Sequence, residues 1–339
     1  MESIQTAGND MEVHRLAIIA RKETLDHITS RKFLLLLLML SIVVGIGAIN
    51  GINDYQSNLE RYKSGDSSDI PSPLSIICPV TSAIGYCGFG AIIAIALGFD
   101  LVAGEKETRS LRSLLSHPLY RDEIINGKAI GGILALTMAI TAVFTLVFAM
   151  LLIQGIVPSL YEFSLMLIIW LITIVFLASN FALALMASVI AGTSSNALIL
   201  TLIILFVLSF FIPVFGAKFT VNTMLGDNPR DEITIVRYYA NSEENEEYLE
   251  RLEDKQRDYN QKESAINDFL SLFSIQSNYS ALTGVFAKPP WDCIDGTPIL
   301  SFNEVINKVW SELLFFLLYP SLFFGIAYVK FMRMDLRQG

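Results

Sequence analysis

The residues of this chain best suited to polar chemistry are the charges of one short loop that separates two long apolar stretches. In order, the loop carries Glu105, Lys106, Glu107, Arg109, Arg112, Pro118 and Arg121. Glutamate and lysine favour helix, Arg109 and Arg112 are one helical turn apart and can share a face, and Pro118 would end such a helix. A short charged helix of this kind can bind a polar protein surface, but it offers no nucleophile and base for catalysis.

The other reactive residues show no pattern of a catalytic or metal site. The three histidines and three cysteines are scattered, without the close spacing of metal ligands. A phosphate-binding loop requires Gly-x4-Gly-Lys-Ser/Thr, whereas Gly127-Lys128 is followed by Ala129, and Asp122 takes the place of the first glycine. We therefore expect no catalytic residue, no metal and no cofactor-binding residue in this chain.

The elements that must position the charged loop are transmembrane helices. The chain has 339 residues, of which 53% are hydrophobic, a fraction that suits a surface facing lipid. A spanning helix needs about 20 apolar residues. Six windows qualify: Phe33–Ile52, Val80–Ala103, Ala129–Val157, Leu165–Ala191, Ala197–Phe215 and Leu313–Met332. The predicted fold class is an all-α integral membrane protein with six transmembrane helices.

Small and polar residues indicate which helices pack against others. The second and fourth windows contain Cys87, Ser179 and Asn180, so we expect these spans to face other helices rather than lipid. Gly127 and Gly131 are four residues apart, which would let the third helix approach a neighbour closely.

The distribution of lysine and arginine predicts the orientation in the membrane. Basic residues are concentrated before the first window, in the charged loop and in the C-terminal tail, and six spans place all three on one side. By the positive-inside rule that side is cytoplasmic. We expect a multi-pass protein of the cell membrane with both termini in the cytoplasm.

This topology divides the chain into four parts. Residues 1–32 form a cytoplasmic or interfacial segment, and residues 33–215 hold spans one to five with a cytoplasmic loop at 104–128. Residues 216–311 form an extracytoplasmic segment, and residues 312–339 hold the sixth span and the tail. The external segment is expected to be mixed but mostly helical, with a possible strand at Ile233–Tyr239. Its acid–base pairs at helical spacing are Glu247–Arg251, Glu253–Arg257 and Asp258–Lys262.

The charged loop also resembles a known family. Its ordered elements are Glu105-Lys106-Glu107, Leu114-Leu115-Ser116, Pro118, Arg121 and Gly127-Lys128. This order resembles the first cytoplasmic loop of ABC-2-type transporter permeases, the membrane subunits of ATP-driven exporters. The chain departs from the family pattern at Arg109-Ser110, where the family usually has Gly-Thr. Before the first span, Arg21-Lys22-Glu23 resembles the family's helix along the inner membrane surface, although the apolar residues around it form no single face.

The resemblance implies a function and a set of partners. Residues Glu105, Lys106, Glu107, Arg109, Arg112, Pro118 and Arg121 would couple the spans to ABC ATPase subunits, two in number, which bind ATP and magnesium as separate chains. A second permease copy or a homologue would complete the pore, in contact with membrane lipid and without nucleic acid. This chain would be a non-catalytic subunit that moves its substrate outward.

The spans limit the class of substrate. Ionisable residues within the windows are almost absent, and Asp100 lies near the inner end of the second window. Proton- or sodium-coupled carriers need acids near the midplane and commonly show inverted repeats, and neither is found. A hydrophobic or amphipathic substrate is therefore expected. The alternative is an ABC-type mechanotransmission or maturation complex that acts on an extracytoplasmic partner without transport.

Two cysteines would face the external side. Cys78 lies at the outer end of the second window and Cys293 in the external segment. A disulfide between them is possible in an oxidising compartment, and two free thiols are the alternative, since the sequence gives no separation.

The topology can be tested by labelling. A cysteine introduced at Ser113 should react only from the cytoplasmic side, and one at Ser242 only from outside, because the six-span arrangement places these loops on opposite sides. The measurement is modification by an impermeant thiol reagent in intact cells, in a background without the native cysteines. Reaction of both sites from outside would show that the six-span topology is wrong.

Overall fold

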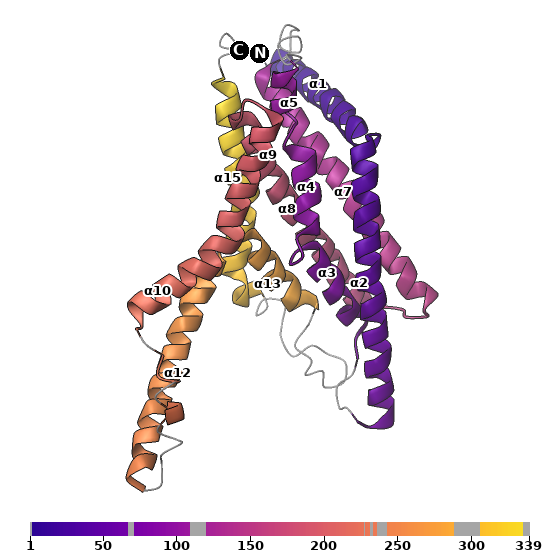
Figure 1. The fold of residues 1–339 in the computed structure, drawn as a ribbon. Helices are drawn as coiled ribbons and strands as arrows, with labels where there is room; N and C mark the ends of the chain where they lie inside the picture. The colour runs from indigo at the N-terminus through magenta and orange to yellow at the C-terminus, as the bar shows by residue number, and fades with distance from the viewer. Residues whose placement is uncertain are drawn as a thin grey trace. The chain divides into compact units, whose positions relative to one another are not determined.

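The computed structural model describes residues 2–66, 71–108, 120–226, 228–230, 233–235, 243–287 and 306–334. Among these residues the regular structure is helical, with no strand. The chain divides into two compact units (Figure 1), which are described separately. Unit 1 comprises Met1–Ile203 and Ile275–Gly339, and unit 2 comprises Ile204–Ser274.

Unit 1 is a bundle of long and short helices. Its elements are α1 (Glu2–Ile28), α2 (Arg31–Ser64), η1 (Pro73–Ile76), α3 (Ile77–Ile84), α4 (Phe89–Gly98), α5 (Ala103–Glu107), α7 (Arg121–Ile153), α8 (Leu160–Ile190), the first part of α9 (Ser194–Phe206), α13 (Ile275–Ala287) and α15 (Trp310–Met332). The start of α7 and the end of α15 meet at the end of the bundle that α1 covers (Figure 1). This end collects the basic segments that the sequence places on one side.

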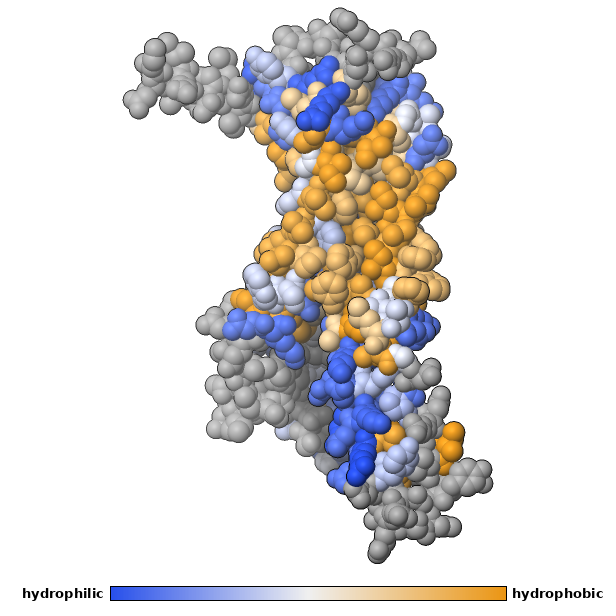
Figure 2. Space-filling model, turned by 90° about the vertical axis from the view of Figure 1, so that its left-hand side faces the viewer, coloured by the Kyte–Doolittle hydropathy of each residue, from blue (hydrophilic) through white to orange (hydrophobic). Residues whose placement is uncertain are grey.

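Within the described part of the chain, five helices are long and apolar enough to cross a membrane. They are α2, α7, α8, the run Ser194–Met224 and α15. A sixth span is reached if the bent pair Pro73–Ile84 and Phe89–Glu107 counts as one. On the face shown in Figure 2, hydrophobic side chains form a broad band, and hydrophilic side chains border it above and below. Five of the six predicted windows therefore coincide with single apolar helices.

The second predicted window differs from expectation because its helix is broken. The two halves are bent by 47°, and Gly88 between them has φ = 76°, a left-handed conformation that glycine adopts without strain. At Gly85 a side chain would meet the ring of Tyr279, at 2.2 Å from its nearest carbon. Tyr86 and Cys87 are exposed at the break. Hydropathy misses the break because apolar residues continue through it.

Helix α8 is the core of unit 1. In its most apolar window 61% of the residues are buried, against 22% to 33% in α2, α7 and α15. It packs against α15, α4, α7 and α13. Ser179 and Asn180 are fully buried, and their side chains donate to the carbonyls of Val175 and Phe176 in the same helix. The prediction that the fourth span faces other helices is confirmed.

Helix α13 is seated against the spans. It packs on α8, α15 and α3, and its Tyr279 is fully buried. The Tyr279 hydroxyl lies 3.1 Å from the hydroxyl of Thr173 on α8, and the Tyr279 ring lies against Phe176, tilted by 30° with 4.4 Å between the ring centroids. The buried hydroxyls satisfy each other, which is the condition for burying polar groups at low cost. This part of the segment predicted to be external thus belongs structurally to the helical bundle of unit 1.

Unit 2 contains η2 (Val207–Gly216, a π-helix), α10 (Ala217–Met224) and the long charged helix α12 (Glu243–Ser271). Lys262 pairs with Asp258 at 2.7 Å, as expected, and Arg257 bonds Asp254 one turn before it. The side chain of Glu247 lies outside the described residues. Residues 233–235 are helical, so the strand expected at Ile233–Tyr239 is wrong there; residues 236–239 lie outside the description.

The seat of Tyr279 at the broken span yields a test. Gly85→Ala should destabilise the protein by about 1–3 kcal/mol, because the new methyl overlaps the tyrosine ring. Gly45→Ala, with nothing within 4 Å of the added carbon, should be neutral or slightly stabilising. Thermal unfolding of the purified protein in detergent measures both.

A second background makes the test specific. In a Tyr279→Leu background the cost of Gly85→Ala should shrink, because residues in contact are not additive. An equal cost in both backgrounds would contradict the proposed contact.

Candidate functional site

The charged loop begins with the short helix α5, which is hydrogen-bonded to the end of α8. The Lys106 ammonium donates to the carbonyls of Val189 and Ala191, at 2.6 and 3.0 Å. These carbonyls lie where α8 ends and have no further turn to bond, so a cation satisfies them and favours the negative end of the helix dipole. In return, the Ser188 hydroxyl accepts from the backbone N–H groups of Val102 and Ala103 at 3.0 and 2.9 Å. Helices α5 and α8 therefore cap each other.

The other side of α5 contacts the start of α9. The Glu107 carboxylate accepts from the backbone N–H of Ser194 at 3.2 Å, a favourable place for a negative charge at a helix N-terminus. Ala103, Ala191 and Ala197 form a small buried cluster beneath these polar contacts. The loop is thus anchored at the connection between two candidate spans, α8 and α9.

A buried ammonium holds three elements together in the same region. Lys128 on α7 is 2% exposed and donates to Glu23 of α1 at 3.1 Å and to Glu105 of α5 at 2.7 Å. A buried lysine needs such partners, because an unpaired charge in this environment costs several kcal/mol. The ion triad fixes α1 and α5 to the start of α7.

Close helix packing supports the triad. A side chain at Gly127 would meet Ile19 at 2.4 Å, and one at Gly131 would meet the Cβ of Glu23 at 2.6 Å. The two glycines therefore admit α1 against α7, which confirms the predicted close approach and identifies the neighbour. Arg15 adds an ion pair to the buried Glu123 at 2.9 Å.

Two further cations, Arg121 and Lys32, contact acceptor groups at the ends of candidate spans. The Arg121 guanidinium donates to the carbonyls of Met332 and Met334, at 3.3 and 2.8 Å, and so caps the end of α15. Lys32 at the start of α2 pairs with Asp100 at 3.0 Å. Each cation meets an acceptor on another element, so the helices of this end are joined by charges rather than by apolar contacts alone.

His27 lies beside the ion triad. Burial lowers the pKa of its imidazole, while the nearby Glu23 opposes this effect and Lys128 adds to it. Its Nε2 atom is buried without a hydrogen bond to any described residue. The lowered pKa favours the neutral imidazole, which places no second positive charge beside Lys128.

The structure brings together part of the predicted site. Glu23, Glu105, Lys106, Glu107 and Arg121 gather around α5 and the start of α7, as described above. Arg21 and Lys22 are exposed on α1. Arg109, Arg112, Pro118 and Cys293 lie outside the described residues. The Sγ atom of Cys78 lies 3.8 Å from the carbonyl oxygen of Ala287, at the end of α13.

Sequence reasoning missed the centre of this site. Lys128 was expected only as part of the Gly-Lys motif that precedes the third span. The available signal was its position: it lies one helical turn after Ile124-Ile125 and directly before an apolar run, so a helical lysine there must find an acid. Ser188 carried no signal, because a serine near the end of a span more often bonds its own helix.

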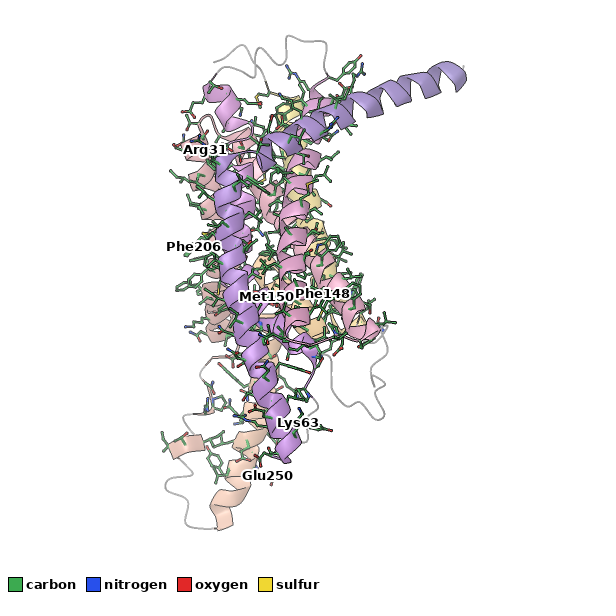
Figure 3. The ribbon with its side chains drawn as sticks, turned by 90° about the vertical axis from the view of Figure 1, so that its right-hand side faces the viewer. Arg31, Lys63, Phe148, Met150, Phe206 and Glu250 are labelled. Atoms are coloured by element: carbon green, nitrogen blue, oxygen red, sulfur yellow. The ribbon has the colours of Figure 1, made fainter. Side chains whose placement is uncertain are left out.

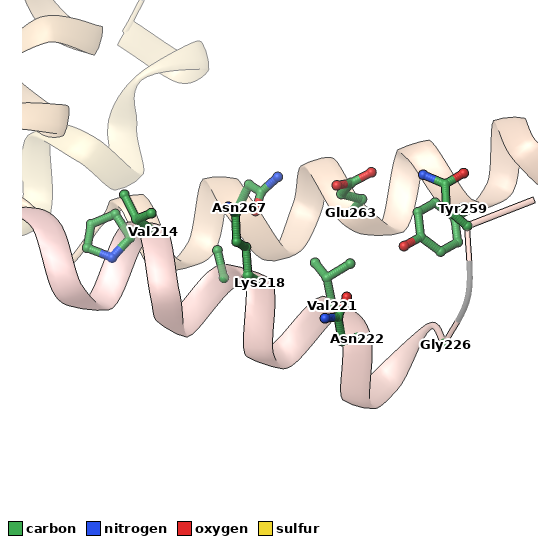
Figure 4. A pocket seen from close by; sticks show the side chains of 11 residues that line it. Val214, Lys218, Val221, Asn222, Gly226, Tyr259, Glu263 and Asn267 are labelled. Carbon is green, nitrogen blue, oxygen red and sulfur yellow. The ribbon is translucent and has the colours of Figure 1, made fainter. Parts of the chain in front are cut away.

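A separate polar cavity lies within unit 2. It has a volume of about 700 Å³ and is formed between α10 and α12 (Figure 4). Lys218 and Asn222 on α10 and Glu263 and Asn267 on α12 line it, together with Tyr259. Among the described residues of the whole chain, no group of histidine, cysteine or acidic side chains could hold a metal ion.

Comparison with known proteins decides the family. The family model described as "ABC-2 family transporter protein" matches residues 17–336, nearly the whole chain. The chain belongs to this ABC-2 family. It is also similar to the "Probable ABC transporter permease protein NosY" of Stutzerimonas stutzeri, with 29% identity over 123 residues. That match covers 36% of this chain and 40% of the relative.

Membership of the ABC-2 family indicates the general role of the protein to which this site belongs. ABC-2 proteins are multi-pass membrane subunits of ABC transporters and are generally non-catalytic, with ATP hydrolysis assigned to a partner. The helical fold and the apolar spans agree with this role. In this ABC-2 protein, the charged loop that carries the family pattern is the one tied to α8, α9, α1 and α7.

The triad predicts an unequal response of two lysines to mutation. Lys128→Met should destabilise the protein by about 3 kcal/mol, because it leaves two carboxylates unpaired in a mostly buried place. Lys32→Met should cost less than about 1 kcal/mol, since that pair is exposed to solvent. Thermal unfolding in detergent compares them.

A compensating variant checks the cause. Adding Glu23→Gln and Glu105→Gln to Lys128→Met should recover part of the loss, because the orphaned charges are removed. If Lys128→Met is as stable as Lys32→Met, the triad does not hold the helices together.

Proposed function

We propose that this chain is the permease subunit of an ATP-driven exporter, and that α5 is the element through which a separate ATPase moves the spans. The observation that carries the proposal is the anchoring of α5 to the α8–α9 connection through Lys106, Ser188 and Glu107. A partner that displaces α5 must displace the ends of two spans with it.

The geometry suits the transfer of motion. Helix α5 is bonded on one side to the end of α8, on the other to the start of α9, and through Lys128 to α1 and α7. When α5 is displaced, the helices packed against it are expected to move as rigid units from one packing arrangement to another. They do not deform gradually, because close-packed interiors are not continuously deformable. Glu107 is exposed beside Ser194 and is available to a partner on its outer side.

The proposed partners follow from family membership. Two ABC ATPase subunits would bind ATP and magnesium and would contact Glu105, Glu107 and Arg112. A second permease copy or a homologue would complete the pathway. In this arrangement both termini and α5 face the cytoplasm of the cell, and α12 and α13 face outside.

The proposed substrate is hydrophobic or amphipathic. Charged side chains of the candidate spans are concentrated at their ends, where Lys128 and Asp100 are paired. A charged substrate held deep in the membrane would need partners there. The exposed Tyr86 at the break of the second span is a candidate wall of the pathway, since broken helices in membranes are found where backbone lines a cavity or is buried in protein.

Mechanotransmission is the second candidate. Unit 2 is compact in its own right and carries a polar cavity between α10 and α12. Such a unit could act on an extracytoplasmic partner without transport. Export and mechanotransmission would both use an ABC ATPase. They differ in whether a transported substrate or an extracytoplasmic partner stimulates ATP hydrolysis.

One experiment separates the candidates. The chain is co-purified with the ABC ATPase, reconstituted in lipid vesicles, and screened for compounds that stimulate ATP hydrolysis. Stimulation by an amphipathic compound that is also carried across the vesicle membrane supports export. Stimulation only by a soluble extracytoplasmic protein supports mechanotransmission, and failure to associate with any ABC ATPase contradicts both.

A point variant tests the role of α5. Lys106→Met should keep membrane insertion and ATPase binding, because the charge is turned toward α8. It should reduce substrate-stimulated hydrolysis by roughly 5–150-fold, the usual range of a coupling free energy. Lys63→Met at the opposite end of α2 is the matched control and should leave stimulation unchanged. Full stimulation in Lys106→Met would refute α5 as the coupling element.

A further inference from the structure

The cavity of unit 2 is lined by opposite charges from two helices. Lys218 lies on α10 and Glu263 on α12, and both border the same space of about 700 Å³ (Figure 4). This volume falls within the range of about 300–1,000 Å³ that is typical of sites for small organic ligands. All of the lining residues belong to unit 2, so the cavity is a property of this unit alone.

The ammonium of Lys218 has no acid beside it. Lys218 is the one charged residue in the sequence of α10, and the sequence of η2 before it contains none. Its exposed side chain forms no hydrogen bond or ion pair with any residue in the described part of the chain. An ammonium offers only donors, so Lys218 is free to bind an anionic group that enters the cavity.

The carboxylate of Glu263 differs from the acids that precede it on α12. Asp254 bonds Arg257, and Asp258 pairs with Lys262 at 2.7 Å. Glu263 is half-buried and pairs with no cation among the described residues. An ionised carboxylate only accepts hydrogen bonds, so Glu263 suits the cationic end of a ligand.

Two side-chain amides and a phenol complete the polar lining. Asn222 lies on α10, and Tyr259 and Asn267 lie on α12, one turn to either side of Glu263. None of these three side chains bonds another described residue. A side-chain amide carries both a donor and an acceptor, as a peptide unit does. Asn222 and Asn267 can therefore form hydrogen bonds with the backbone of a bound peptide.

The floor of the cavity is apolar. Ala217 and Val221 on α10 are only 5% and 6% exposed, and Val214 continues this surface. The face of α12 from Tyr259 to Asn267 is about 12 Å long at 1.5 Å per residue. That length corresponds to about three residues of extended chain.

We propose that the cavity between α10 and α12 binds a short peptide with free ends. Lys218 pairs with the terminal carboxylate of the peptide and Glu263 with its terminal ammonium. Asn222 and Asn267 bond the peptide units between the ends, and small side chains rest on the apolar floor. This binding goes beyond the proposed function, since it requires neither an ATPase nor a particular side of the membrane.

A zwitterion suits the cavity better than a ligand of one charge. Glu263 repels an anion and Lys218 repels a cation, so each charge of the cavity discriminates against one class of ligand. A single amino acid carries both charges but has no peptide unit for the two amides. A short peptide satisfies the charges and the amides together.

The test is isothermal titration calorimetry of the full chain, purified in detergent without an ATPase. Three probes are compared: trialanine, N-acetyltrialanine, which lacks the ammonium, and trialanine amide, which lacks the carboxylate. The intact protein should bind trialanine and should bind each capped peptide roughly tenfold more weakly, the usual effect of losing a hydrogen bond to a charged group.

Two variants assign the ends of the peptide. Lys218→Met should weaken the binding of trialanine and N-acetyltrialanine by roughly tenfold. It should leave trialanine amide unaffected, because that probe has no carboxylate to lose. Glu263→Gln should weaken trialanine and trialanine amide but not N-acetyltrialanine.

The controls remove the same charges away from the cavity. Lys63→Met on α2 and Glu250→Gln on α12 alter exposed residues that do not line it (both are labelled in Figure 3). Both variants should bind all three probes as the intact protein does. Thermal unfolding should be unchanged in all four variants, because none of the altered side chains is fully buried or paired with a described residue.

Three outcomes overturn the proposal. The first is an intact protein that does not bind trialanine. The second is a Lys218→Met variant that loses affinity for all three probes equally, since the lysine then does not read the carboxylate. The third is a Lys218→Met variant that inserts poorly into the membrane but binds trialanine normally, which would make Lys218 an anchor of the helix end. Because no ATPase or ATP is present, failure here leaves the exporter proposal standing.

Discussion

The buried ammonium of Lys128 is the constraint on which the end of unit 1 covered by α1 depends. A charge that is 2% exposed must be matched by partners, and here the partners come from two other elements, Glu23 of α1 and Glu105 of α5. The pairing determines where both elements lie on α7. Gly127 and Gly131 then follow as a steric requirement, because α1 approaches too closely for any side chain at either position.

The ends of helices explain the remaining charges of the site. A helix leaves its last carbonyls and first N–H groups unpaired, and several of these groups are buried where spans meet. Lys106 and Arg121 serve the carbonyl ends of α8 and α15, and Glu107 serves the N–H end of α9. The described ends of the loop, α5 and the start of α7, are thus part of the bundle, although the composition of the loop is that of a solvated segment. The same contacts that complete the helix ends join the loop to the spans.

The sequence predicts this protein unevenly, for physical reasons. The spans can be predicted from the length and hydropathy of the apolar stretches. The charged loop can be recognised from the order of its motif residues. The break at Gly85 and Gly88 is missed because hydropathy carries no information on the backbone angle φ of Gly88. It also cannot indicate that the ring of Tyr279, about 190 residues away in sequence, packs on Gly85. The ion triad is missed for the same kind of reason: Lys128, Glu105 and Glu23 become partners only after three helices assemble.

Helix α8 gives the loop and the broken span a common element. Its Ser188 bonds the start of α5, and its Thr173 bonds Tyr279, the residue whose ring fills the space at Gly85. Fifteen residues separate Ser188 from Thr173, a rise of about 22 Å along one continuous helix. We infer that a displacement of α5 is carried along α8 as a rigid body to α13 and the break. Such a route exists only if its two ends are energetically coupled. Loss of the contact between the buried hydroxyls of Thr173 and Tyr279 would break this coupling.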